Sequence, residues 1–170
     1  MDLITALAIV IGVMGAIATW AAVTIGSPYV LIWAIFVAWG SFFHCGGKEA
    51  GLKSSVVANI WGAICAAVAL IALVSLGVSA VTAGLCVGVT IVILIMGAKV
   101  PALSAIPAAV YGYASTAALF LHGAAAYGEG TGAIVKVAVA VIISMLIGNV
   151  LGYISEKVVG AVVTKKSATA

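Results

Sequence analysis

The chain consists of long apolar runs separated by short polar or glycine-rich breaks. Six runs are long enough to cross a bilayer, because a membrane-spanning helix needs roughly 20 mostly apolar residues. They cover approximately residues 3–25, 28–45, 54–76, 79–98, 102–127 and 132–155. Stretches such as Ala66–Val74 are continuously apolar, which is typical of helices rather than of alternating membrane β-strands. The pattern predicts an all-α, polytopic membrane protein with six transmembrane helices.

The breaks between the runs carry turn signals. Gly26-Ser27-Pro28 places a proline where it can open the second helix. Lys99-Val100-Pro101 ends the fourth helix, because the residue before a proline is disfavoured in a helix. Gly46-Gly47-Lys48-Glu49 is the most polar break. We expect a single transmembrane domain over residues 1–163 and a short basic cytoplasmic tail over residues 164–170.

The composition supports the membrane assignment. Of the 170 residues, 66% are apolar and 6% are charged, whereas an average soluble domain is about 25% charged. So few charges cannot cover the surface of a soluble protein, and disorder requires low hydrophobicity. The net charge of +3 is too dispersed for a nucleic-acid patch. The expected partners are therefore the lipid bilayer and a small-molecule solute, and not nucleic acid.

The lysines predict the orientation in the membrane. With six spans, the side that holds both chain ends carries six lysines, and the other side carries only Lys136. The six are Lys48, Lys53, Lys99, Lys157, Lys165 and Lys166. Because cytoplasmic loops of membrane proteins are enriched in basic residues, we expect a bacterial inner-membrane protein with both termini in the cytoplasm.

Small residues recur at helical spacing, as in Gly12 with Ala16, Gly84 with Gly88, and Gly148 with Gly152. Such positions let helix backbones approach closely, and packing is what holds helices together in lipid. A tight bundle that forms a homo-oligomer is one interpretation. The alternative is that small residues are simply common in membrane helices.

The two histidines hint at an internal repeat. Pro28 precedes His44 by 16 residues, and Pro107 precedes His122 by 15. Each histidine ends the middle helix of a three-helix half, and halves with an odd number of spans must be inverted. The sequence thus allows two inverted three-helix repeats, with His44 near the cytoplasmic face and His122 near the opposite face.

Polar residues at membrane depth are the candidates for function. Asn59 and Asn149 fall in the cytoplasmic thirds of the third and sixth spans, on the same side as His44. Intramembrane polar groups usually face a bundle interior or a water-filled cavity. They can line a path that exchanges hydrogen bonds with a small polar solute. Alternatively, they form interhelical hydrogen bonds that hold the bundle together.

Aromatic and hydroxyl side chains complete the predicted solute pathway, which comprises Asn59, Asn149, His44, Trp39, Trp61, Tyr111, Ser115 and His122. Selectivity in such a pore follows from its diameter and its hydrogen-bonding groups. We expect a channel or facilitator for a small neutral or weakly acidic solute. The alternative is a non-transporting structural or accessory membrane protein. No catalytic or metal-binding motif is present, so we expect no enzyme activity, cofactor or metal.

Two segments carry a family resemblance. Residues 43–53 read FHCGGKEAGLK, and Ile106-Pro107 is followed by Tyr111-Gly112 and later by Phe120. These segments resemble a small bacterial inner-membrane family of unknown function that includes the enterobacterial protein YcdZ. The resemblance implies a multi-span inner-membrane protein and supplies no substrate. By size and span count the chain is also similar to six-helix acetate and urea channels, although it lacks their signature motifs.

Overall fold

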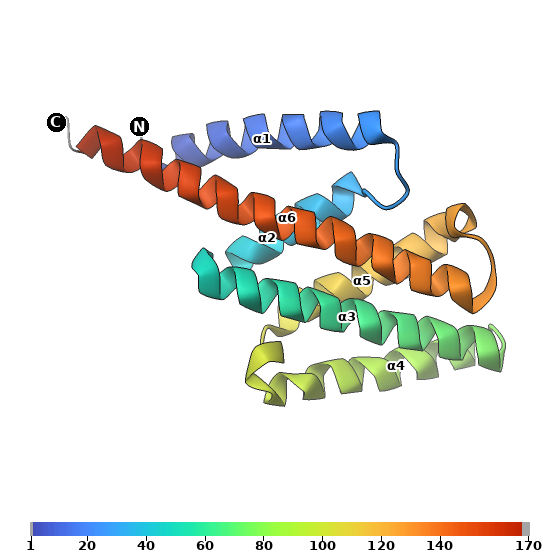
Figure 1. The fold of residues 1–170 in the computed structure, drawn as a ribbon. Coiled ribbons are helices and arrows are strands. Elements are labelled where there is room, and N and C mark those ends of the chain that lie inside the picture. The colour runs from blue at the N-terminus through green and yellow to red at the C-terminus, as the bar shows by residue number, and fades with distance from the viewer. Residues whose placement is uncertain (1, 168–170) are drawn as a thin grey trace.

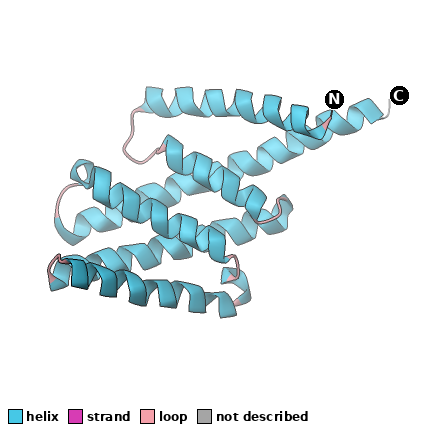
Figure 2. Ribbon diagram, turned by 180° about the vertical axis from the view of Figure 1, so that it is seen from behind, coloured by secondary structure: helices cyan, strands magenta, loops and turns pink. Residues whose placement is uncertain are grey.

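The computed structural model describes residues 2–167, with side chains through residue 163. Within that range the chain is all-helical, as predicted, and has no strand (Figure 1 and Figure 2). The α-helices are α1 (Leu3–Ile25), α2 (Ile32–His44), α3 (Lys48–Leu76), α4 (Ala80–Met96), α5 (Ile106–Gly123) and α6 (Gly130–Ser167). The 3₁₀ turns are η1 (Gly97–Lys99), η2 (Pro101–Leu103) and η3 (Ala124–Tyr127).

Four segments of the described chain are long and apolar enough to cross a membrane. They are α1, α3, α4 extended through η1, and α6. The helix α2 is also apolar but has only 13 residues. Helices of this composition identify a membrane protein, because their apolar surfaces need lipid in place of water.

The helices form two layers with a helix at each edge. α3 and α6 lie side by side in one layer, and α2 and α5 lie behind them (Figure 1). The view from behind shows α2 and α5 in front (Figure 2). α1 packs along α6 at one edge, and α4 packs along α3 at the other. The beginning of α1 and the end of α6 lie at the same end of the bundle (Figure 1).

Glycines set the contact between the layers. A Cβ atom at Gly62 of α3 would lie 1.8 Å from the Ala109 carbonyl oxygen of α5. A Cβ atom at Gly148 of α6 would lie 2.1 Å from the Ile35 carbonyl oxygen of α2. At both crossings one backbone therefore touches the other, and any larger residue would push the helices apart.

α2 begins later than the apolar pattern predicts, at Ile32 instead of residue 28. Pro28 lies in the preceding turn, and Ser144 of α6 holds the residues that follow it. The Ser144 hydroxyl accepts a hydrogen bond from the Leu31 N–H at 2.9 Å and lies 3.3 Å from the Tyr29 carbonyl oxygen. These contacts take up backbone groups that a longer helix would have bonded internally.

α3 begins earlier than predicted, at Lys48 instead of residue 54. Gly47 precedes it with a φ of +67°, a conformation that glycine adopts readily. The helix start has no side-chain cap of its own. Instead, the Glu156 carboxylate of α6 accepts a hydrogen bond from the Lys48 N–H at 2.7 Å, where the helix dipole favours a negative charge.

The last two helices also differ in extent from the predicted spans. α5 covers less than the expected 102–127, because η2 and η3 occupy its flanks. α6 covers more than the expected 132–155, since no proline interrupts it. The predicted tail, 164–170, is helical in its backbone through Ser167, and residues 168–170 lie outside the described residues. α1 matches its predicted span, and α4 falls within 79–98.

Candidate functional site

A buried polar network joins four helices where the layers cross. Its centre is Asn59 of α3, whose amide nitrogen donates to the Ala108 carbonyl of α5 at 2.8 Å and lies 3.3 Å from the Ser41 hydroxyl of α2. The Ser55 hydroxyl lies 3.4 Å from the Asn59 amide oxygen and 2.7 Å from the Ser41 hydroxyl. Each buried group in this set thus gains a partner from another element, which avoids a large desolvation cost.

Asn149 of α6 completes the network. Its amide nitrogen donates to the Asn59 amide oxygen at 2.9 Å and to the Met145 carbonyl at 2.9 Å. Its amide oxygen is buried and has no hydrogen-bond partner among the described residues. The space beside the two amides does not admit a water molecule. The structure therefore brings the two predicted asparagines together, as an interhelical pair and not around an open lumen.

A pocket of about 450 Å³ opens beside the last turn of α2. We call it the His44 pocket, and it is lined by His44, Cys45, Gly46, Ser54, Ala105, Pro107 and Ala108. The His44 Nδ1 atom lies 2.8 Å from the Tyr111 hydroxyl of α5. These two predicted pathway residues thus form a hydrogen-bonded pair at the junction of α2 and α5.

Cys45 connects the His44 pocket to the polar network. It lies in the turn after α2 and is partly buried. Burial raises the pKa of its thiol, and the nearby hydroxyls of Ser55, Ser54 and Ser41 offset part of that rise. Because Ser41 and Ser55 also contact Asn59, a chain of polar groups runs from the pocket to the middle of the bundle.

A second pocket, of about 310 Å³, lies at the other end of the α2–α5 pair. We call it the His122 pocket, and it is lined by Trp33, Ala118, Leu119, His122 and Gly123. Trp33 is near the start of α2, whereas His122 is near the end of α5. The His44 pocket instead combines the end of α2 with the start of α5. The two helices therefore run antiparallel, and each contributes one histidine to one of the pockets.

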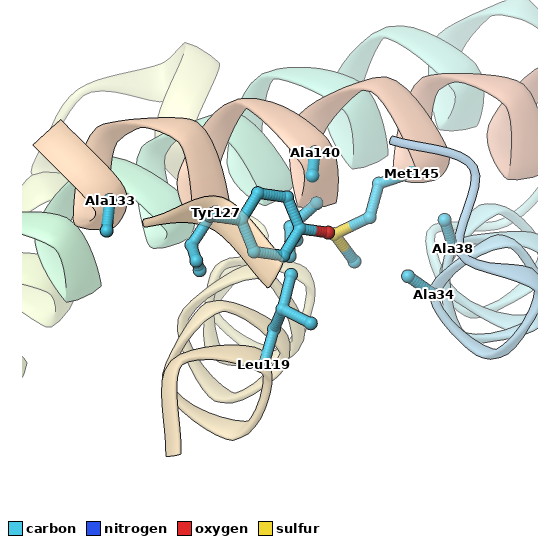
Figure 3. Packing of buried hydrophobic residues seen from close by; sticks show 9 residues of the cluster. Ala34, Ala38, Leu119, Tyr127, Ala133, Ala140 and Met145 are labelled. Carbon is cyan, nitrogen blue, oxygen red and sulfur yellow. The ribbon is translucent and has the colours of Figure 1, made fainter. Parts of the chain in front are cut away.

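An apolar cluster fills the bundle between the His122 pocket and the polar network. It contains Ala34, Ala38, Leu119, Tyr127, Ala133, Val137, Ala140, Val141 and Met145. Leu119 projects from α5 toward Tyr127 and Met145 (Figure 3). The Tyr127 hydroxyl donates to the Pro28 carbonyl, which ties η3 to the turn before α2.

The remaining predicted pathway residues lie apart from one another. The Trp39 indole N–H donates to the Ser155 hydroxyl of α6 at 3.0 Å, so its ring is buried between α2 and α6. The Trp61 indole N–H donates to the Leu94 carbonyl at 3.1 Å, which places it between α3 and α4. Ser115 is buried on α5 with 5% of its surface exposed.

Three residues that join helices in the structure are not among the residues predicted from the sequence. Ser55 lies four residues before Asn59 and hence on the same helix face, a spacing that could have identified it. Ser41 carries no such signal, because its role depends on how α2 meets α3. Glu156 lies one residue beyond the predicted sixth span, and its contact with Lys48 depends on the unexpected length of α6.

The residues that the structure describes contain no group of three His, Cys, Asp or Glu side chains that could hold a metal ion. Cys45, Cys65 and Cys86 are free thiols. The polar side chains of the network and of the two pockets are imidazole, amide, hydroxyl and thiol groups.

Comparison with known protein families gives a match over most of the chain. Residues 8–160 match the model of a family described as protein of unknown function DUF1097. The chain belongs to this family. The match agrees with the resemblance to a family of unknown function and leaves the likeness to YcdZ untested. No curated protein and no solved structure matches the chain significantly.

Proposed function

We propose that this DUF1097 protein is a channel or facilitator for a small neutral or weakly acidic solute in the bacterial inner membrane. The observation that carries the proposal is the pair of pockets at opposite ends of α2 and α5, each beside one of the two histidines. The path runs along the α2–α5 junction past Tyr111 and Ser115. The chemistry is transport rather than catalysis.

The packing of the helices supports two inverted three-helix repeats. α2 packs on α6 as α5 packs on α3, and α1 packs on α6 as α4 packs on α3. If α1, α2 and α3 are exchanged for α4, α5 and α6, each of these helix contacts becomes another contact that is also present in the structure. Inverted repeats commonly place a solute site at the repeat interface, near helices interrupted by proline. Here the interface includes α2 and α5, each of which follows a proline-containing segment.

Six crossings require α2 to span the bilayer together with the turn before it. Its 13 residues extend about 20 Å, less than the hydrocarbon core of about 30 Å. Irregular backbone is tolerated at membrane depth only where its polar groups are satisfied within the protein. Tyr127 and Ser144 satisfy backbone groups of Pro28, Tyr29 and Leu31. Both termini then lie on the lysine-rich, cytoplasmic side.

The structure corresponds to a closed state of the proposed path. The apolar cluster closes the half near His122, and the Asn59–Asn149 pair closes the inner end of the polar track. Opening requires Leu119 and its neighbours to separate, which admits water and solute between α2 and α5. Trp39 and Trp61 are then scaffold residues that hold α2 to α6 and α3 to α4.

Solute-driven swelling of proteoliposomes tests the proposal. Liposomes containing the purified full chain should swell faster than protein-free liposomes with acetamide, urea, glycerol or acetic acid. A bulky thiol reagent attached to Cys45 should slow the swelling, because Cys45 lines the His44 pocket. The Cys45→Ser variant should be insensitive to the reagent. Swelling equal to protein-free liposomes with all four solutes would reject a channel for this solute class.

A non-transporting structural or accessory role is the second candidate. It is favoured by the polar network, in which every side-chain group except the Asn149 amide oxygen is paired and no water-sized space remains. Under this hypothesis the asparagines only hold the bundle together. The swelling assay separates the two functions, because a structural protein gives no solute-specific swelling.

We also propose that the chain forms a homo-oligomer. Gly148 and Gly152 are used in packing within the chain, whereas a Cβ atom at Gly12, Gly84 or Gly88 would meet nothing within 4 Å. These open glycines lie on α1 and α4, the edge helices with little buried surface. Gly84→Leu with Gly88→Leu should lower the protein mass measured by light scattering in detergent. A wild-type mass equal to one chain would contradict assembly.

A further inference from the structure

We infer, on the basis of the proposed function, that the His44 pocket binds a neutral solute that both donates and accepts hydrogen bonds, and rejects carboxylate anions. The polar side chains that line it are an imidazole, a thiol and a hydroxyl, those of His44, Cys45 and Ser54. The hydroxyl of Tyr111 contacts the imidazole at 2.8 Å. All of these groups can serve as donor or acceptor, which suits an amide or a polyol.

No lysine, aspartate or glutamate side chain lines the His44 pocket. An anion that leaves water needs a cation or several N–H donors in compensation, whereas a neutral solute needs only hydrogen-bond partners. The turn beside the pocket carries charges of both signs, because Lys48 follows Gly47 and its N–H binds the Glu156 carboxylate. The lining therefore gives a carboxylate no lysine side chain to pair with.

The start of α5 also borders the pocket, and helix starts often bind anions through free N–H groups. At this helix start the free groups are scarce. The Ile106 N–H bonds to the Ser104 carbonyl, Pro107 has no N–H, and the Ala109 N–H bonds to the Ala105 carbonyl. Three of the first four residues of α5 thus have no free N–H group that could bind an anion. Binding in the pocket therefore depends on side-chain groups.

The volume of the pocket fits a solute of a few heavy atoms with accompanying water. It measures about 450 Å³, within the range of ligand pockets, and a water molecule occupies about 30 Å³ in the liquid. Acetamide and acetate are a suitable matched pair of probes. They have nearly the same shape and differ in charge and in the presence of N–H donors.

Cys45 is a native reporter for occupancy of this pocket. It is partly exposed there, whereas Cys65 and Cys86 are buried within the helical bundle. A charged thiol reagent should consequently label Cys45 selectively in the purified full chain. A solute bound in the pocket should slow that labelling, and this measurement does not depend on transport.

The experiment compares the rate of Cys45 labelling with increasing acetamide or with increasing acetate. Acetamide should slow labelling severalfold in a saturable manner, and acetate should not. Ser54→Ala should weaken protection by about fivefold, as expected for the loss of one hydrogen bond. Tyr111→Phe should also weaken it, because the His44 imidazole loses the hydroxyl that holds it in place. Ser75→Ala is the matched control, because the Ser75 hydroxyl is exposed and bonds only to its own helix.

The results distinguish this inference from the proposed function. Equal protection by acetate, or no protection by acetamide, would overturn the inference even if proteoliposomes swell. Protection by acetamide without any swelling would support the binding site and overturn transport. Protection that persists unchanged in both Ser54→Ala and Tyr111→Phe would also overturn the inference, because the solute would then bind elsewhere.

Discussion

The Asn149 amide nitrogen donates a hydrogen bond to the Asn59 amide oxygen across 2.9 Å, where α6 meets α3. The two amides are unequal partners in this bond. Asn59 also contacts Ser41, Ser55 and the Ala108 carbonyl, which lie on three helices. Asn149 has only the Met145 carbonyl of its own helix as a second partner, and its amide oxygen has none among the described residues.

Asn59→Leu should therefore destabilise the protein more than Asn149→Leu. The first change leaves the Ala108 carbonyl and the Asn149 amide nitrogen short of partners, whereas the second removes one interhelical bond and an unpaired oxygen. An interhelical hydrogen bond in a membrane protein is worth about 0.6 kcal/mol on average and about 1.7 kcal/mol at most. The free energy of unfolding, measured in mixed micelles with denaturing detergent, gives the comparison.

The double variant provides the control for this prediction. If the two amides interact directly, the losses in the single variants should sum to more than the loss in the double variant. Equal destabilisation by the two single changes, with no coupling between them, would contradict the network as described.

Gly62→Ala should separate α3 from α5. A Cβ atom at this position would lie 1.8 Å from the Ala109 carbonyl oxygen, and backbone cannot move aside as a side chain can. Overpacking of this kind costs about 1–3 kcal/mol or more. Gly40→Ala on α2 is the matched control, because its added Cβ would meet nothing within 4 Å. Thermal unfolding should show a lower midpoint for Gly62→Ala only; equal midpoints would contradict the crossing.

The sequence predicted the helical class and the approximate positions of the helices because lipid imposes one simple requirement, a long apolar segment. It also selected Asn59 and Asn149, whose side chains the structure brings into direct contact. It could not identify Ser41 as a partner of Asn59, nor Glu156 as the cap of α3. Those contacts depend on which helices cross and at what register. The crossings in turn depend on Gly62 and Gly148, which resemble every other glycine in the sequence.

Labelling of Cys45 should keep increasing above pH 9. The thiolate is the reactive form, and burial raises the pKa of this thiol above its ordinary value of 9.0. At any lower pH a smaller fraction is therefore ionised than in an exposed cysteine. Ser54→Ala should raise the pKa further, because the Ser54 hydroxyl lowers it. Rates measured from pH 7 to 10 test this, and a plateau below pH 9 would contradict the burial.

The same reagent reports on orientation when it cannot cross membranes. With both termini in the cytoplasm, Cys45 faces the cytoplasmic side. Labelling should occur in inside-out membrane vesicles and not in intact spheroplasts. The reverse result would invert the proposed topology without affecting the fold.

Leu119→Ala should speed solute flux in proteoliposomes, because Leu119 both lines the His122 pocket and belongs to the apolar cluster that closes the path. Its removal should extend the pocket toward Tyr127 and Met145 (Figure 3). A large-to-small change in a core costs about 2–5 kcal/mol, so the folded fraction must be measured alongside. Leu121→Ala is the matched control on the same helix, because Leu121 is 69% exposed. A folded Leu119→Ala protein whose flux equals that of Leu121→Ala would show that this cluster does not close a solute path, and the structural role of the protein would then be preferred.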